Sequence, residues 1–139
     1  MKNRSRQITI AAALFAAFVV AIQYSDRPHA EEKESGSMIV HDVYFTLKDD
    51  SAQEQQRLVD ACKKYLQDHP GVVFFAAGLR VPDFKREVND QNFHVGLHVI
   101  FDSRKAHDDY QVAPKHLQFI EECKGNWDKV RVFDTVAEK

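Results

Sequence analysis

A phenol and an imidazole lie six positions apart in the segment YQVAPKHLQF, from Tyr110 to Phe119. Pro114 stands between them and suits the first turn of a helix, because its missing N–H would be unpaired there anyway. His116 then lies in that first turn, where the positive end of the helix dipole disfavours imidazolium. A neutral imidazole can remove a proton next to a carbonyl group, and a phenol can donate a hydrogen bond to the oxygen that gains charge. Tyr110 and His116 are therefore candidate catalytic residues.

A third candidate, His41, lies in a segment whose apolar and polar residues alternate. This alternation over 38–48 predicts a strand, on which His41 shares one row with Val43 and Phe45. If that row borders a pocket beneath the helices, His41 would orient a substrate oxygen or hold the His116 ring in one tautomer. Each candidate also has a structural interpretation: a core tyrosine, a histidine that caps a helix end, and a hydrogen-bonded core histidine.

The elements that must position these residues follow in order along the chain. The patterns predict strands at 38–48, 72–81, 93–101 and 127–136, a helix at 51–68, and a helical region at 103–123 that is interrupted before Pro114. The charged segment 82–91 has no periodicity and is expected to form a loop. The order β-α-β-β-α-β predicts a ferredoxin-like α+β fold, in which both helices cover one face of a four-stranded sheet.

The other face of that sheet is expected to carry apolar side chains that no helix covers. By alternation it holds Val40, Tyr44, Phe74, Ile100 and Phe133. Such a surface is too apolar to remain in contact with water. We therefore expect a homodimer, in which a second copy covers the face and closes a dimeric α/β barrel.

Composition and spacing argue against several kinds of function. The chain has 139 residues and a formal net charge of -2, so it offers no basic surface for nucleic acid. His94 and His98 share the opposite row of their strand and would lie about 13 Å apart, too far to share one metal ion. We expect neither a metal nor a cofactor.

His107 is expected to be exposed on its helix. Cys62 and Cys123 either form a disulfide in an exported protein or pack as small hydrophobic residues.

The first residues of the chain differ from the rest. Lys2, Arg4 and Arg6 precede an apolar run at 8–22, which is shorter than the roughly 20 residues of a spanning helix and typical of a secretory signal. We interpret 1–22 as a signal peptide or a short membrane anchor, 23–37 as a disordered polar linker and 38–139 as the folded domain. Such a chain would be exported, either to the periplasm or to the membrane surface at the cell envelope.

Several of these motifs together resemble a known family. They are the strand IVHDVYFTLK, the HPGV turn, Gly78, and FDSRKAHDDYQVAPKHLQF followed by W-x5-FD. In these motifs the chain is similar to the stress-responsive α/β-barrel domain, often called Dabb, over 38–136. The resemblance implies a ferredoxin-like monomer and a homodimer whose two sheets close into a barrel.

The resemblance also implies a function. One plant member of the family is a polyketide cyclase that performs an aldol condensation without metal or organic cofactor. Its catalytic tyrosine and histidine match Tyr110 and His116, and a further pocket histidine matches His41. Its pocket wall is similar to Val43, Phe45, Leu58, Val59, Cys62, Phe75, Leu97, Phe119, Trp127, Val130 and Val132.

Two kinds of function follow from these expectations. The first is a pocket for a small apolar or aromatic carbonyl ligand, with proton abstraction and aldol-type cyclisation by Tyr110 and His116. The alternative is a non-catalytic, stress-associated dimer that binds a ligand or has a structural role. Cys62 stands where the plant cyclase has an aromatic residue, so the resemblance does not carry over that enzyme's substrate.

Overall fold

The computed structural model describes residues 37–138. Its elements are β1 (Met38–Leu47), α1 (Ala52–Leu66), β2 (Val72–Leu79), β3 (Val95–Phe101), α2 (Arg104–Gln111), α3 (Pro114–Cys123), a 3-10 turn (Lys124–Asn126) and β4 (Trp127–Ala137). The predicted order of strands and helical regions is confirmed, including the interruption before Pro114. The predicted signal peptide and nearly all of the predicted linker lie outside the described residues. Within 37–138, no helix is long and apolar enough to cross a membrane.

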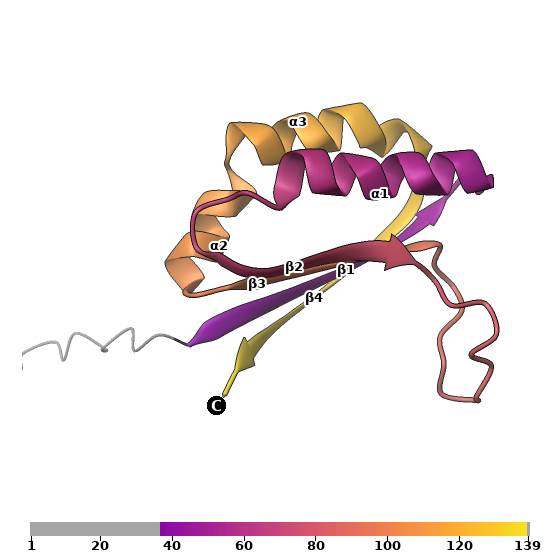
Figure 1. Cartoon of the computed structure of the whole chain (residues 1–139), viewed down its shortest axis with the longest axis horizontal. Helices are drawn as coiled ribbons and strands as arrows, with labels where there is room; N and C mark the ends of the chain where they lie inside the picture. Colours follow the sequence, from indigo (N-terminus) through magenta and orange to yellow (C-terminus); the bar gives the residue numbers. More distant parts are fainter. Residues whose placement is uncertain (1–36, 139) are drawn as a thin grey trace, which may run out of the picture. The chain divides into compact units, whose positions relative to one another are not determined.

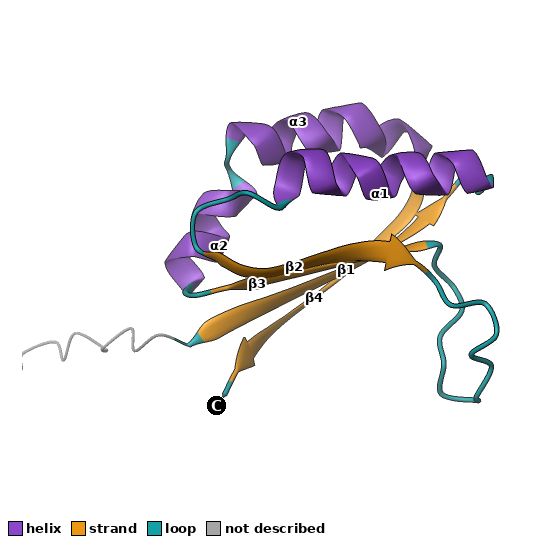
Figure 2. Cartoon of the chain, in the orientation of Figure 1, coloured by secondary structure: helices purple, strands orange, loops and turns teal. Residues whose placement is uncertain are grey.

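The four strands form one antiparallel sheet in the order β2-β3-β1-β4. Figures 1 and 2 show α1 and α3 over the same face of this sheet, with α2 near the end where β3 finishes. This is the ferredoxin-like α+β fold that the sequence predicts. β1 is a central strand, and it places His41 opposite Val99 of β3 on one side and Asp134 of β4 on the other.

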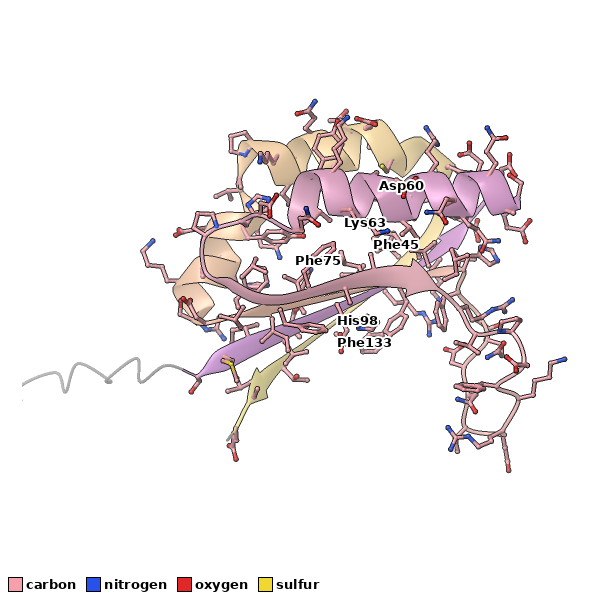
Figure 3. The ribbon with its side chains drawn as sticks, in the orientation of Figure 1. Phe45, Asp60, Lys63, Phe75, His98 and Phe133 are labelled. Carbon is pink, nitrogen blue, oxygen red and sulfur yellow. The ribbon has the colours of Figure 1, made fainter. Side chains whose placement is uncertain are left out.

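The core lies between the sheet and the helices. Burial alternates along β1, whose buried row is Ile39, His41, Val43, Phe45 and Leu47. The side chains of Phe45 and Phe75 lie between the sheet and the helices in Figure 3. Cys62 and Cys123 are buried free thiols, so they pack as hydrophobic residues and form no disulfide. Burial raises the pKa of the Cys62 thiol to about 12, which makes it a poor nucleophile.

The turn before β2 fixes the position of α2. Gly71 has a positive φ of 79°, and a Cβ atom added there would lie 2.3 Å from the Cβ of Ala106 in α2. The Gly71 carbonyl also accepts a hydrogen bond of 2.8 Å from the backbone N–H of Asp102. Ser103 then caps α2 by accepting from the N–H of Ala106. Glycine is therefore required where this turn meets the helix that carries Tyr110.

The second face of the sheet is apolar, and no helix within residues 37–138 covers it. Phe74 and Phe133 are 51% and 50% exposed, and Tyr44 packs edge-on against Phe133. His98 and Phe133 lie on the side of the sheet away from the helices in Figure 3. His98 is paired across the sheet with Asp42 at 2.6 Å, from Nδ1 to Oδ1. An unpaired apolar face of this kind is suited to cover by a second copy of the chain.

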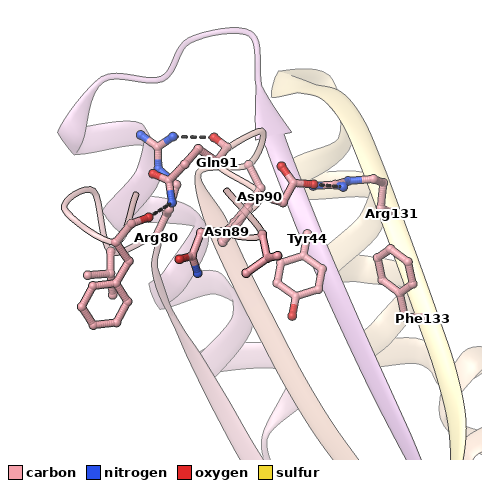
Figure 4. A pocket seen from close by; sticks show the side chains of 11 residues that line it. Tyr44, Arg80, Asn89, Asp90, Gln91, Arg131 and Phe133 are labelled. Carbon is pink, nitrogen blue, oxygen red and sulfur yellow. Dashed lines mark hydrogen bonds and ion pairs between the residues drawn. The ribbon is translucent and has the colours of Figure 1, made fainter. Parts of the chain in front are cut away.

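A cavity of about 390 Å³ opens on this second face, beneath the loop that joins β2 to β3. Figure 4 shows Tyr44 and Phe133 on its wall. Its two arginines are already paired: Arg131 with the Asp90 carboxylate, and Arg80 with the Gln91 carbonyl, each at 2.5 Å. Because Tyr44 and Phe133 of the open face line this cavity, it lies on the face that a partner subunit would cover.

We predict that Phe133→Glu converts a dimer into a monomer, because the new carboxylate would be desolvated in an apolar interface at a cost of several kcal/mol. Sedimentation velocity of the full chain at micromolar concentration measures this. Val112→Glu is the control, since Val112 lies between α2 and α3 and is 71% exposed, so that variant should sediment like the parent. A Phe133→Glu variant that stays dimeric would contradict the use of this face.

Candidate functional site

A cavity of about 190 Å³ lies on the helix side of the sheet, toward β4. All three predicted catalytic residues line it: His41 from β1, Tyr110 from the last turn of α2, and His116 from the first turn of α3. The rest of its wall is Val43, Phe45, Leu97, Gln111, Phe119, Ile120, Trp127, Val130 and Val132. The site therefore combines a mostly apolar wall with a few polar groups that converge on it, as small-molecule sites do.

The Tyr110 side chain is buried, and its hydroxyl has no hydrogen-bond partner among the described residues. Its ring lies 4.4 Å from the ring of His116, centroid to centroid. Burial raises the pKa of the Tyr110 phenol far above its ordinary value, with a smaller contribution from Cys62. The phenol stays protonated at neutral pH, so its O–H remains a donor. A buried hydroxyl without a partner lowers the stability of the fold, which is a reason to look for a ligand that pairs with it.

The backbone holds the His116 ring in one tautomer. Its Nδ1 lies 3.1 Å from the Gln111 carbonyl oxygen, which can only accept, so Nδ1 carries the proton. The lone pair of neutral His116 is therefore on Nε2. Burial lowers the pKa of the His116 imidazole, the Gln111 hydrogen bond opposes this, and the neighbouring histidines, His41 first, lower it further. The direction agrees with the expectation from the helix dipole, but burial is the main cause.

A carboxylate fixes the orientation of His41. His41 is buried, and its Nδ1 lies 2.6 Å from Oδ1 of Asp134, the residue directly opposite it on β4. Its ring lies edge-on to Tyr110 at 5.9 Å. The Asp134 side chain is 47% exposed, so the pair reaches from the buried site to the surface. The Gln111 carbonyl, and not His41, fixes the tautomer of His116.

Two further histidines, His107 and His69, lie near the site, and the sequence did not predict either of them there. His107 is not exposed as expected: 16% of its side chain is accessible, and its ring lies 5.4 Å from that of His41. It precedes Tyr110 by one helical turn, and this i,i+3 spacing is the signal that could have placed it on the same helix face. His69 lies 4.9 Å from the Tyr110 ring. It comes from the turn before β2, and nothing local in the sequence indicates that contact.

The predicted pocket wall divides into two groups. Val43, Phe45, Leu97, Phe119, Trp127, Val130 and Val132 line the cavity. Leu58, Val59 and Cys62 are instead buried in the core on α1, and Phe75 packs against that core from β2. The reason is the strand order, because β2 and β4 form opposite edges of the sheet and the cavity lies toward β4. Gln111 and Ile120 line the cavity and were not predicted.

The larger cavity beneath the β2–β3 loop offers no comparable chemistry. None of Tyr110, His116 and His41 lines it, and both of its arginines are paired. It is the more open and the larger of the two, but the site near β4 has a neutral imidazole beside an unpaired phenol. We therefore take the smaller cavity as the candidate functional site.

The lowered pKa of His116 predicts a dependence of stability on pH. Above the unfolded-state pKa of about 6.5 the ring is neutral in both states and contributes nothing. As pH falls below that value the unfolded chain gains a proton that the folded chain resists, so stability decreases. His116→Gln should therefore lose less unfolding free energy than the parent between pH 7 and pH 5, as measured by urea denaturation. An equal loss in both proteins, or NMR titration of His116 above pH 6.5, would contradict this.

No curated protein matches the chain, but several solved structures share its fold. A Dabb family protein from Mesorhizobium loti is 30% identical, with a TM-score of 0.61 over 74% of this chain and 99% of that one. A dimeric ferredoxin-like protein of unknown function from Thermobifida fusca is 15% identical, with a TM-score of 0.62 over 74% and 93%.

A plant enzyme shares the same fold. The hydroxynitrile lyase from Passiflora edulis is 20% identical, with a TM-score of 0.59 over 75% of this chain and 96% of that one. The family model described as the stress responsive A/B barrel domain matches residues 39–137, nearly the whole described region. The chain therefore belongs to the stress-responsive A/B barrel domain family, Dabb.

Proposed function

We propose that this protein binds a small carbonyl compound in the cavity near β4 and moves a proton on it without a cofactor. The apolar wall favours an apolar or aromatic ligand, and the volume of about 190 Å³ favours a small one. The observation that carries the proposal is the buried Tyr110 hydroxyl, which has no hydrogen-bond partner in the part of the chain that the structure describes. It lies next to an imidazole whose Nε2 holds a lone pair. The dimeric neighbours support a homodimer as the functional unit.

The proposed step moves one proton within the bound complex. Nε2 of His116 takes a proton from the carbon next to the carbonyl. The electron pair of that C–H bond forms a C=C bond, and the π pair of the carbonyl moves to its oxygen. Tyr110 donates its O–H hydrogen bond to this oxygen as negative charge develops. His116 then returns the proton to carbon, or the enolate carbon attacks a second carbonyl of the same ligand. In the second case a carbon–carbon bond forms, and the new alkoxide takes the proton from His116. Burial of both groups strengthens these interactions, because water does not screen them.

His41 has a positioning part in this proposal. Its Nδ1–H donates to Asp134, and its ring packs edge-on against Tyr110. The ring therefore limits where the phenol can move when a ligand enters. The Passiflora edulis hydroxynitrile lyase supports the proposal only in that its fold accommodates a lyase.

The alternative is a dimer that binds a ligand without reaction. Dimeric ferredoxin-like proteins of unknown function from Thermobifida fusca and Bacteroides fragilis share the fold and give no reason to expect catalysis. In that case the Tyr110 hydroxyl serves to bind a ligand oxygen only. The two functions differ in one observable, the exchange of ligand C–H protons with solvent.

We predict opposite effects of Tyr110→Phe on stability and on function. Removing an unpaired buried hydroxyl should raise the free energy of unfolding without ligand by about 1 kcal/mol. It should also slow deuterium exchange next to the carbonyl of a bound ligand by roughly 10²-fold to 10³-fold, because a donor to the developing oxyanion is lost. Urea denaturation measures the first effect. NMR in deuterated water, with a panel of small aromatic and β-keto compounds, measures the second.

Tyr65→Phe is the matched control. Tyr65 is also buried, but its hydroxyl donates to the Glu122 carboxylate, so the same change should lower stability and leave exchange unaffected. His116→Gln should abolish the exchange. Compounds that bind with no exchange in the parent protein would favour the alternative of a binding dimer. A Tyr110→Phe variant with lower stability than the parent would show that its hydroxyl has a partner.

We also propose that the chain is exported, with 1–22 acting as a signal peptide or a short anchor at the cell envelope. The basic residues before the apolar run at 8–22 support this. In a bacterial host, the protein should appear in the periplasmic or membrane fraction. Replacing Lys2, Arg4 and Arg6 by Ser should shift it to the cytoplasm. Cytoplasmic location of the parent chain would contradict export, and the mass of the product, against 16.0 kDa for the whole chain, reports cleavage.

A further inference from the structure

Two imidazoles and one carboxylate converge beside the candidate site from three different elements. They belong to His41 of β1, His107 of α2 and Asp134 of β4, and one ligand atom from each lies within 4.8 Å of the others. Nδ1 of His41 is 2.6 Å from Oδ1 of Asp134, and Nε2 of His107 is 3.8 Å from the same oxygen. Because β1 and β4 are paired in register, two of the three groups are held on adjacent strands.

The surroundings of His107 direct its lone pair to this cluster. Its Nδ1 lies 2.9 Å from the Asp108 carboxylate, to which it donates a proton. Its Nε2 lies 3.1 Å from the side-chain amide nitrogen of Gln111, which is a donor, so Nε2 accepts. The ring is thus in the tautomer whose Nε2 carries the lone pair, and a metal ion bound there would displace the Gln111 amide. A carboxylate on the far nitrogen of a histidine is the usual outer-shell arrangement at metal sites.

Solvent reaches the cluster of His41, His107 and Asp134 without passing through the candidate functional site. A surface cavity of about 210 Å³ is lined by His107, Asp134 and Arg104, and neither Tyr110 nor His116 lines it. The side chain of Asp134 is 47% exposed, so solvent borders it on one side and it is not packed on every side. Arg104 lowers the affinity for a cation there, while its charge favours an anion at an open coordination position.

We propose that His41, His107 and Asp134 bind one divalent transition-metal ion, for which Zn²⁺ is the probe. Nδ1 of His41, Nε2 of His107 and one Asp134 oxygen are a donor set that such ions prefer over Mg²⁺ or Ca²⁺. Ligand bonds of about 2.0–2.2 Å require separations of roughly 3.3–3.6 Å between donor atoms. The His107–Asp134 distance of 3.8 Å is already close to this, and the His41–Asp134 pair opens from 2.6 Å by about 1 Å or less. The His41 and His107 donor atoms lie within 4.8 Å of each other, so this third pair closes by at most about 1.5 Å. The metal replaces the proton between His41 and Asp134.

This site does not depend on the proposed proton transfer. His41 belongs to both, but His116 and Tyr110 supply no ligand to the metal. Binding of the ion would anchor His41 and bring a Lewis acid to the edge of the cavity. Three protein ligands leave a fourth position open, as in catalytic rather than structural sites.

The test is titration of the full chain, prepared without a histidine tag and freed of metal by a chelator, with Zn²⁺ at pH 7.5. Isothermal titration calorimetry should show one saturable site per chain. His107→Gln and Asp134→Asn should each weaken binding by at least about tenfold, the loss typical even of an outer-shell partner. Both residues are at the surface edge of the cluster, and circular dichroism confirms that the metal-free variants are folded. Co²⁺ should give the visible absorption bands of a four-coordinate site in the parent and not in His107→Gln or Asp134→Asn.

His98→Gln is the matched control. His98 pairs with Asp42 at the same 2.6 Å distance, but no third ligand from residues 37–138 joins them, so this variant should bind Zn²⁺ like the parent. Absence of saturable binding would overturn the proposal, and so would equal affinity in His107→Gln. An equal loss in His98→Gln would assign the ion to surface histidine–aspartate pairs. Activity of His116→Gln has no bearing on these outcomes, so failure of the proposed reaction is distinguishable from failure of the metal site.

Discussion

The alternation of side chains along β1 is the constraint on which the rest of the structure depends. One row of this central strand points to the helices and the other to the open face. The position of a residue along β1 therefore decides which of the two faces its side chain joins. The buried row brings His41 into the apolar space under α2 and α3, between Ile39 and Val43. A shift of register by one residue would expose that row and would separate His41 from Asp134 on β4. The fold, the open face and the candidate site therefore share one cause.

The candidate site concentrates polar groups where the fold would be more stable without them. Tyr110 is almost fully buried, and its hydroxyl has no partner among the described residues. The rings of His41, His69 and His116 lie within 6 Å of its ring. Burial acts in opposite directions on the two acid–base groups, because it disfavours whichever form is charged. It raises the pKa of the phenol and lowers the pKa of the His116 imidazole. Both are therefore neutral at pH 7, one as a donor and the other as an acceptor.

Local sequence patterns predicted the elements because alternation and helical spacing are strong within each segment. They also predicted Pro114 as the start of a separate helix, whereas Tyr110, His116 and His41 were candidates because of their chemistry and the resemblance to the family. They did not predict the contacts that depend on how segments meet. His69 reaches Tyr110 only because Gly71 lets the turn approach α2 closely. Leu58, Val59, Cys62 and Phe75 lie in the core, because sheet order and not residue type decides which apolar side chains border the cavity.

The central claim is that Tyr110 and His116 act together on one carbonyl group. A crystal structure of the protein with a small aromatic β-keto compound tests it most directly. The account predicts the Tyr110 hydroxyl within about 2.6–3.2 Å of a carbonyl oxygen, with Nε2 of His116 facing the adjacent carbon. A ligand seated in the open cavity beneath the β2–β3 loop, with the Tyr110 hydroxyl still unpaired, would contradict it.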